Sequence, residues 1–153
     1  MAITKPVPGS INAPLGSQQE SGVNAFAGEN ILKISGLSSD IVVAATSIAT
    51  VTGGDIEIEQ MLFDTDATGL AGGTNLQILT DDTGQANMMV ETVANLGANK
   101  SIDLFTASVT KQRRVIRSGK HLQINSTVAA CTGAGVWTLY VHYRPCVQTA
   151  LLQ

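Results

Sequence analysis

Apolar or small residues alternate with polar ones along much of this chain, and the longest such stretch lies in residues 119–145. The alternating positions are Leu122, Ile124, Ser126 and Val128 in a first run and Trp137, Leu139, Val141 and Tyr143 in a second. A period of two is typical of half-buried β-strands. Residues 132–135, Thr-Gly-Ala-Gly, can form a tight turn between the runs, and Pro145, which lacks an N–H, ends the second run. The stretch therefore predicts a long β-hairpin that must lay its apolar face on another sheet, because an isolated hairpin is barely stable in water.

Shorter alternating or β-branched runs recur from residue 31 onward, with turn residues between them. They lie at 31–34, 40–52, 55–63, 76–80, 87–93 and 102–106, and the basic segment 113–117 precedes the hairpin. In the run 55–63 the predicted inward residues are Ile56, Ile58 and Met61, and the predicted outward ones are Asp55, Glu57 and Glu59.

Two of these runs leave an alternative open. Residues 40–52 also fit helical spacing, but their many Val, Ile and Thr residues favour a strand. Residues 88–96 could form a strand or two helical turns that end at Gly97, and a strand is favoured. Eight or nine strands without a long helix predict an all-β fold. Long early and late strands around short middle ones favour an antiparallel β-sandwich of the jelly-roll type.

The first 28 residues differ from the rest of the chain. They hold three of the four prolines and show no sustained period, so they predict an extended N-terminal arm. The arm is either a disordered tail or a segment that becomes ordered along a neighbouring subunit, with Ile11, Leu15 and Phe26 as its anchors. The predicted organisation is an arm over 1–28, a β-sandwich over 29–147 and a short C-terminal tail over 148–153.

Composition indicates what kind of surface such a domain presents. A chain of 153 residues is long enough for one domain with one core. Hydrophobic residues make up 44% but aromatic ones only 4%, so that core should be mainly aliphatic. Charged residues make up only 14%, which predicts a hydroxyl-rich outer face, and part of that face is expected to be hidden in an assembly.

The few charges are unevenly distributed. Residues 1–99 hold eleven of the twelve acidic groups, whereas residues 100–153 hold seven of the nine basic ones. Six of these basic groups lie close together in the sequence: Lys100, Lys111, Arg113, Arg114, Arg117 and Lys120. The interpretations are a solvated basic face or a contact with an acidic protein surface, including a neighbouring copy of this chain. Nucleic acid is not expected as a partner, because no aromatic residues interleave with the basic ones and the chain is acidic overall.

The two cysteines and the N-terminal sequence indicate in which cellular compartment the chain is expected. If the hairpin turns near Gly133, then Cys131 and Cys146 lie too far apart to form a disulfide. Two unpaired thiols favour a reducing compartment or assembly inside a cell. The N-terminus has no apolar signal segment, and no window approaches about 18 uninterrupted apolar residues, so neither secretion through a signal peptide nor a membrane span is expected.

Candidate chemical groups are sparse. Asp64 and Asp66, and the pair Asp81 and Asp82, lie in predicted loops and could hold a calcium ion, although ordinary turn chemistry is the favoured role. The two histidines, His121 and His142, lack a nucleophile context and are expected to be structural. The sequence contains no GxSxG, GxGxxG or P-loop motif. We therefore expect a protein that is not an enzyme and that needs no cofactor or metal.

Three segments resemble a known family. They are residues 94–104, with Ala-Asn-Leu-Gly-Ala-Asn leading into Ile-Asp-Leu, residues 118–124, Ser-Gly-Lys-His-Leu-Gln-Ile, and residues 139–145, Leu-Tyr-Val-His-Tyr-Arg-Pro. Together, over about 30–146, they resemble the jelly-roll decoration proteins of tailed bacteriophages, also called cement or head-stabilising proteins. The resemblance implies a homotrimer that binds the major capsid protein on the exterior of an expanded icosahedral virion after assembly in the host cytoplasm.

The expected contact residues follow from this hypothesis. Those of the arm are Ile11, Leu15 and Phe26, and those of the basic region are Lys111, Arg113, Arg114, Arg117 and Lys120. The alternatives are a glycan- or receptor-binding jelly-roll module of a phage fibre, and another minor capsid or head-fibre protein. Glycan binding is less favoured, because the predicted loops carry no Trp or Tyr.

Overall fold

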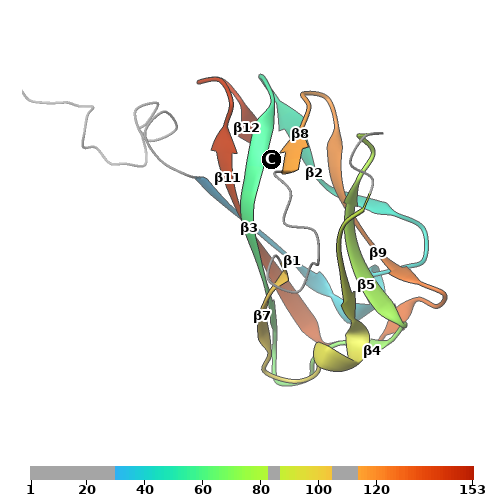
Figure 1. Cartoon of the computed structure of the whole chain (residues 1–153). Coiled ribbons are helices and arrows are strands. Elements are labelled where there is room, and N and C mark those ends of the chain that lie inside the picture. Colours follow the sequence, from blue (N-terminus) through green and yellow to red (C-terminus); the bar gives the residue numbers. More distant parts are fainter. Residues whose placement is uncertain (1–29, 83–86, 105–113) are drawn as a thin grey trace, which may run out of the picture.

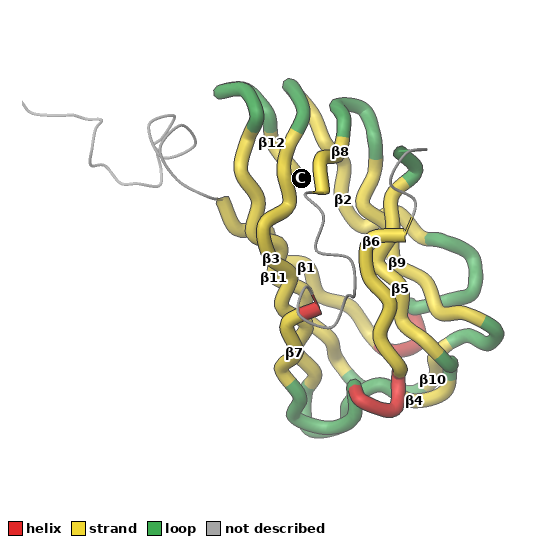
Figure 2. The backbone as a smooth tube through the Cα atoms, in the orientation of Figure 1, coloured by secondary structure: helices red, strands yellow, loops and turns green. Residues whose placement is uncertain are grey.

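The computed structural model of the chain describes residues 30–82, 87–104 and 114–153, and this part of the chain is all-β with antiparallel sheets (Figures 1 and 2). The strands are β1 (Asn30–Leu37), β2 (Thr46–Thr52), β3 (Ile56–Thr65), β4 (Ala71–Gly72), β5 (Asn75–Thr80), β6 (Asn87–Thr92), β7 (Ser101–Asp103), β8 (Arg114–Ile116), β9 (His121–Thr127), β10 (Cys131–Thr132), β11 (Val136–Pro145) and β12 (Leu151–Leu152). Two 3₁₀ helices, η1 (Ser38–Asp40) and η2 (Val93–Asn95), follow β1 and β6. The described residues thus hold twelve strands rather than the eight or nine expected, and three of the twelve have only two residues.

The longer strands form two sheets. The first sheet has the order β1-β11-β3-β7, with β8 also pairing with β3, and the second has the order β12-β2-β9-β5-β6. In Figure 1 strands of the first sheet form the wall on the left, and β5 and β9 of the second sheet form the wall on the right. A small ladder of β4 with β10 lies at one end. Every one of these strand pairs is antiparallel.

Some of the strand pairs are nested one inside the next in the sequence, whereas others, such as β2 with β12, cross them. The outermost pair joins β1 to β11, and the next joins β2 to β9. Inside these, β3 pairs with β7 and β8, and β5 pairs with β6. Successive strands along the chain therefore alternate between the two sheets for much of its length.

One hydrophobic core draws its residues from both sheets. It includes Ile58, Met61 and Phe63 of β3, Leu76 and Ile78 of β5, Leu122 and Ile124 of β9, and Leu139 and Val141 of β11. The ring of Trp137 stacks on Phe63 with 5.7 Å between the ring centroids, and its indole N–H donates a hydrogen bond to the carbonyl of Leu37 at 2.9 Å. The sole tryptophan therefore fixes β1, β11 and β3 to one another at one end of the core.

The period-two pattern correctly identified where these strands lie and which of their residues face the core, but not which strands pair with one another. Strands form at both runs of residues 119–145, and their inward positions are buried except for Val128, which is 84% exposed after β9 has ended. The predicted hairpin is wrong, because β9 pairs with β2 and β5 whereas β11 pairs with β1 and β3. The glycine-rich residues between them carry the chain from one sheet to the other, so the two apolar faces share the core instead of lying side by side.

Other expectations are corrected in detail. The long strand expected at 40–52 begins only at Thr46, and Asp40 belongs to η1, where its carboxylate accepts the N–H of Leu37 at 2.7 Å. Residues 87–92 are a strand, and the helical alternative is limited to the single turn of η2. Glu57, expected to face solvent, is buried. The last residues, expected as a tail over 148–153, carry β12, which pairs with β2, so the packed body extends to Leu152.

Replacing the central aromatic residue tests this description of the core. Trp137→Ala should lower the free energy of unfolding by about 3–5 kcal/mol, because it leaves a cavity beside Phe63 and removes a buried hydrogen bond. Val136→Ala, at the neighbouring position that is 39% exposed, should change it by no more than about 0.5 kcal/mol. Urea denaturation followed by circular dichroism measures both, and equal effects would contradict the account.

Candidate functional site

Three aspartates and the segment that leads into β9 form an ionic junction. Its members are Asp55, Asp81 and Asp82 on one side and Arg117, Ser118 and His121 on the other. Asp82 lies just after β5 and is 1% exposed. Its Oδ2 accepts hydrogen bonds from the backbone N–H of Arg117 at 3.1 Å and from Nε at 2.9 Å, and Nη2 of the same arginine donates to Oδ1. The carboxylate and the guanidinium therefore form a two-pronged pair, which is the strong geometry for these groups.

The other two aspartates hold neighbouring backbone groups of the same segment. Asp81 accepts the backbone N–H of His121 at 2.8 Å, and its second oxygen lies 2.7 Å from Nδ1 of that ring. Asp55, just before β3, accepts the N–H of Ser118 at 3.0 Å. These carboxylates thereby tie the turn between β8 and β9 to the ends of β3 and β5. Turn chemistry was the favoured role for Asp81 and Asp82, and they act here by holding a turn elsewhere in the chain.

The junction shifts the protonation equilibria of its members. The side-chain hydrogen bonds from Arg117 are the main reason that the pKa of Asp82 falls to about 2. The hydrogen bond with His121 is the largest cause that lowers the pKa of Asp81. The pKa of Arg117 is raised, chiefly by its hydrogen bond to Asp82. Both aspartates are therefore ionised at neutral pH, and the charge of Arg117 is compensated within the chain.

One predicted contact residue of the basic region, Arg117, already has a partner within the chain. Arg117 is 59% exposed, but its guanidinium already faces Asp82, so it is not available in full for the acidic surface of a partner. Lys120 is half-buried and its carbonyl accepts the N–H of Val51 at 2.9 Å. Arg114 contributes its backbone to β8 opposite Ile58, and its side chain lies outside the described part. Lys111 and Arg113, and the arm anchors Ile11, Leu15 and Phe26, also lie outside the described residues.

A second ionic group explains the burial of Glu57. Nη2 of Arg144, on β11, lies 3.3 Å from Oε2 of Glu57 and 3.1 Å from Oε1 of Glu59. The arginine lies opposite Glu57 in the register of β11 and β3. Burying a carboxylate is costly unless an opposite charge compensates it. Arg144, the last basic residue of the sequence and not among the predicted contacts, therefore has a role within the fold.

The other acidic and histidine candidates act separately. Asp66 accepts the N–H groups of Thr68 and Gly69, each at 2.9 Å, and these backbone hydrogen bonds lower its pKa. Asp64 accepts the hydroxyl of Ser101 at 2.6 Å. His121 lies on the second sheet and His142 on the first, so the two rings are not brought together. Within the described residues no three His, Cys, Asp or Glu side chains are grouped so that they could hold a metal ion.

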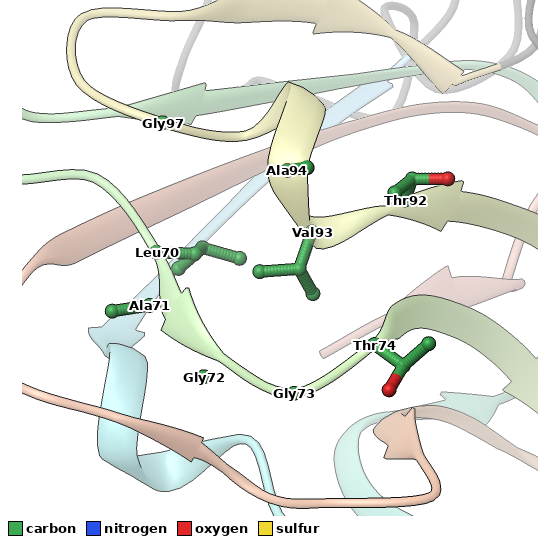
Figure 3. Close-up of a pocket in the computed structure, with 9 residues that line it drawn as sticks. All are labelled: Leu70, Ala71, Gly72, Gly73, Thr74, Thr92, Val93, Ala94 and Gly97. Carbon is green, nitrogen blue, oxygen red and sulfur yellow. The ribbon is translucent and has the colours of Figure 1, made fainter.

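A shallow pocket of about 440 Å³ lies near the ladder of β4 and β10 (Figure 3). Its lining residues are Leu70, Ala71, Gly72, Gly73, Thr74, Thr92, Val93, Ala94 and Gly97. Figure 3 shows the side chains of Leu70 and Val93 pointing toward one another, with Thr74 at the far end. None of the lining side chains is ionisable, so this pocket can hold a small apolar group but offers no acid, base or charged ligand for catalysis.

Glycine is required in the wall of this pocket. Gly73 has φ of +63°, and a Cβ there would lie 2.5 Å from the hydroxyl oxygen of Ser126 and 2.8 Å from the sulfur of Cys131. Cys131 is buried behind this wall, and burial raises the pKa of its thiol, whereas Cys146 is exposed. A buried thiol with a raised pKa is a poor nucleophile. The cysteine therefore packs the wall rather than supplying chemistry to the pocket.

Comparisons with known proteins give no family assignment. No family model matches the chain, and neither the curated proteins nor the solved structures contain a match to it. No helix in the described part of the chain is long and apolar enough to cross a membrane.

The ionic junction predicts a specific acid sensitivity. The pKa of Asp82 is about 2 in the folded chain, against an ordinary value of 3.8, so its stabilising effect is fully present above about pH 4 and is lost as the pH falls toward 2. Urea midpoints of the parent and of Asp82→Asn should therefore differ most above pH 4 and converge near pH 2. Arg117→Gln should flatten the same pH step, and an unchanged step in both variants would contradict the assignment.

The pocket wall predicts a difference between two glycines. Gly73→Ala should lower the free energy of unfolding by about 1–3 kcal/mol, because alanine is strained at positive φ and its Cβ meets Ser126 and Cys131. Gly97→Ala, in the same pocket, has nothing within 4 Å of the added Cβ and should stay within about 1 kcal/mol of the parent. Chemical denaturation of both variants measures the difference, and a tolerated Gly73→Ala would refute the close packing.

Proposed function

We propose that this chain is a structural virion protein that binds the outer surface of an icosahedral phage capsid as a trimer and stabilises it, which is the role of a decoration protein. The proposal rests first on the resemblance of residues 94–104, 118–124 and 139–145 to that family. It is also supported by what the described residues offer, namely extended strand surfaces and open edges rather than a cleft with converging acidic, basic or nucleophilic groups.

We infer that the fold is a β-sandwich of the jelly-roll type. The support comes from the strand order, because the pairs β1 with β11, β2 with β9, β3 with β7 and β8, and β5 with β6 are nested one inside the next. A jelly roll has two sheets of four principal strands, and β1-β11-β3-β7 and β2-β9-β5-β6 fit that arrangement. The short strands β4, β10 and β12 are additions to it.

The observation that carries the functional proposal is the open edge at β1. This strand of eight residues ends the first sheet and has only β11 beside it in the described structure. It exposes Ile31 by 58% and Leu37 by 43%. An open and partly apolar strand edge favours pairing with another chain. Since β1 begins at Asn30, the predicted arm over 1–28 joins the body at this edge, where a contact of β1 with a neighbour or with the shell would extend into the arm.

Assembly into a trimer makes docking contacts that are individually weak sufficient for capsid binding. Three copies of one docking surface, held together, bind a repetitive shell with an avidity that exceeds the single affinity by about 10²–10⁴ when all can engage at once. In this proposal the docking contacts come from Ile11, Leu15 and Phe26 of the arm and from Lys111, Arg113, Arg114 and Lys120. Arg117 contributes by holding the segment in place through Asp82.

Co-sedimentation with capsids tests the proposal. The purified chain is mixed with expanded, undecorated heads of the phage that encodes it, and the heads are pelleted. We expect saturable binding at a fixed ratio of chains to capsid subunits and a higher temperature of head disruption. Absence from the pellet, or binding on a glycan array instead, would contradict the proposal and favour a receptor-binding module.

The same assay separates the arm from the body. Deletion of residues 1–28 should abolish co-sedimentation while the circular dichroism spectrum and the unfolding midpoint of the body stay unchanged. A full-length variant with Ile11, Leu15 and Phe26 all replaced by alanine should bind at least tenfold more weakly. Unchanged binding of both variants would refute the role of the arm without refuting capsid binding by the body.

A further inference from the structure

The outer face of the second sheet differs chemically from that of the first. Residues that lie opposite one another on neighbouring strands share a face of the sheet. Gln77 of β5 lies opposite Asn125 of β9 and opposite Val90 of β6, and Asn75 lies opposite Thr127. The alternate residues of the same strands, such as Ile78 and Ile124, are buried in the core. The amide and hydroxyl side chains therefore point away from the core, and we call this surface the amide face.

The amide face carries no Asp, Glu, Lys or Arg among its described side chains. The β2, β5, β9 and β12 strands contain no such residue at all, and Glu91 of β6 lies opposite the buried Leu76, on the core-facing side. The first carboxylate appears at the rim, where Asp81 contacts the ring of His121. Exposed apolar side chains flank the face, with Val90 46% exposed and Leu151 44% exposed.

The outer face of the first sheet provides the contrast within the same molecule. Its row across the strands contains Lys33, Tyr140, Leu62 and Asp103, which lie opposite one another in register. The ammonium group of Lys33 lies 5.8 Å from the ring centroid of Tyr140, and Gln60 donates to Asp103 at 3.0 Å. Charges are therefore tolerated on one sheet and missing from the other, which a general shortage of charged residues does not explain.

A face without charges fits association with a second copy of itself. Charges buried in an interface must be desolvated, and the centres of interfaces are depleted of them. In a trimer the interfaces join different patches of neighbouring subunits, but a side chain close to the three-fold axis approaches its own copies, so a charged group there would face like charges. Gln and Asn avoid this repulsion because each amide both donates and accepts hydrogen bonds.

A neutral glycan is the other partner that amides and hydroxyls could bind. Sugar rings are generally held on aromatic faces, and no aromatic side chain lies among the described residues of the amide face. Tyr140 lies on the other sheet. The amide face thus lacks the aromatic platform for a sugar but has the mixture of uncharged polar and exposed apolar groups that suits a protein interface.

We propose that copies of this chain associate through the amide face of the second sheet, which deepens the trimer part of the proposed function and rests on it for the number of copies. The first sheet, with its charged outer face and its β1 edge, is then left to contact the shell. Val90 and Leu151 supply apolar contacts at the periphery of this interface. Asn75 and Gln77 supply uncharged hydrogen bonds at its centre, next to Asn125, whose amide nitrogen already donates to the carbonyl of Val43 at 2.9 Å.

Light scattering coupled to size-exclusion chromatography tests this proposal without any capsid. The full chain should have about three times the monomer mass of 15.9 kDa. Val90→Glu and Gln77→Glu, which place a charge in the amide face, should each shift the mass to that of one chain. Val90→Thr, which keeps a β-branched and uncharged side chain, should preserve the assembly.

Val136→Glu is the matched control, because it also replaces an exposed strand valine by a carboxylate-bearing residue, but on the first sheet. It should leave the mass unchanged, and circular dichroism checks that every variant is folded. A monomeric parent chain, or folded Val90→Glu and Gln77→Glu variants that keep the parent mass, would overturn the proposal. So would binding of a neutral glycan that Gln77→Glu abolishes. Capsid pelleting is scored separately, so the amide face can be refuted while capsid binding stands, and capsid binding can fail while the assembly stands.

Discussion

Burial of aliphatic side chains between two sheets is the constraint on which the rest of this structure depends. With few aromatic residues available, the chain fills its core with Ile, Leu, Val and Met from both sheets, and Trp137 and Phe63 provide the largest stacked contact. Each sheet can bury only one face, so its other face and its edges remain for contacts with other molecules. The outer faces and the edges of the two sheets are therefore the surfaces on which a function of the described part should be sought.

Electrostatics determines which of these surfaces are available. Asp82 and Arg117 neutralise each other at one end of the body, and on the first sheet Arg144 compensates part of the charge of Glu57 and Glu59. These pairs use two of the seven basic groups that the sequence concentrates after residue 100. The charge asymmetry along the chain is thus partly resolved inside the fold, because the acidic first half and the basic second half supply opposite members of the same ion pairs.

The sequence predicted the all-β class, most strand positions and the inward residues, because period-two alternation depends only on which face is buried. It did not predict strand partners, since pairing depends on long-range register that local patterns do not encode. For that reason residues 119–145 were interpreted as one hairpin although β9 and β11 lie in different sheets. The partners Asp82 and Arg117 are 35 residues apart, and Glu57 and Arg144 are 87 apart, so no sequence spacing revealed them. The charge-free character of β2, β5 and β9 was visible in the sequence, but its meaning required knowing that they are neighbours.

Cryo-electron microscopy of particles of the phage proposed to carry this protein tests the central claim most directly. The account predicts density for three chains together on the outer surface of the capsid, with the second sheets turned toward their common axis and the first sheets toward the shell. Density for this chain at the tip of a tail fibre, or its absence from the capsid exterior, would contradict it.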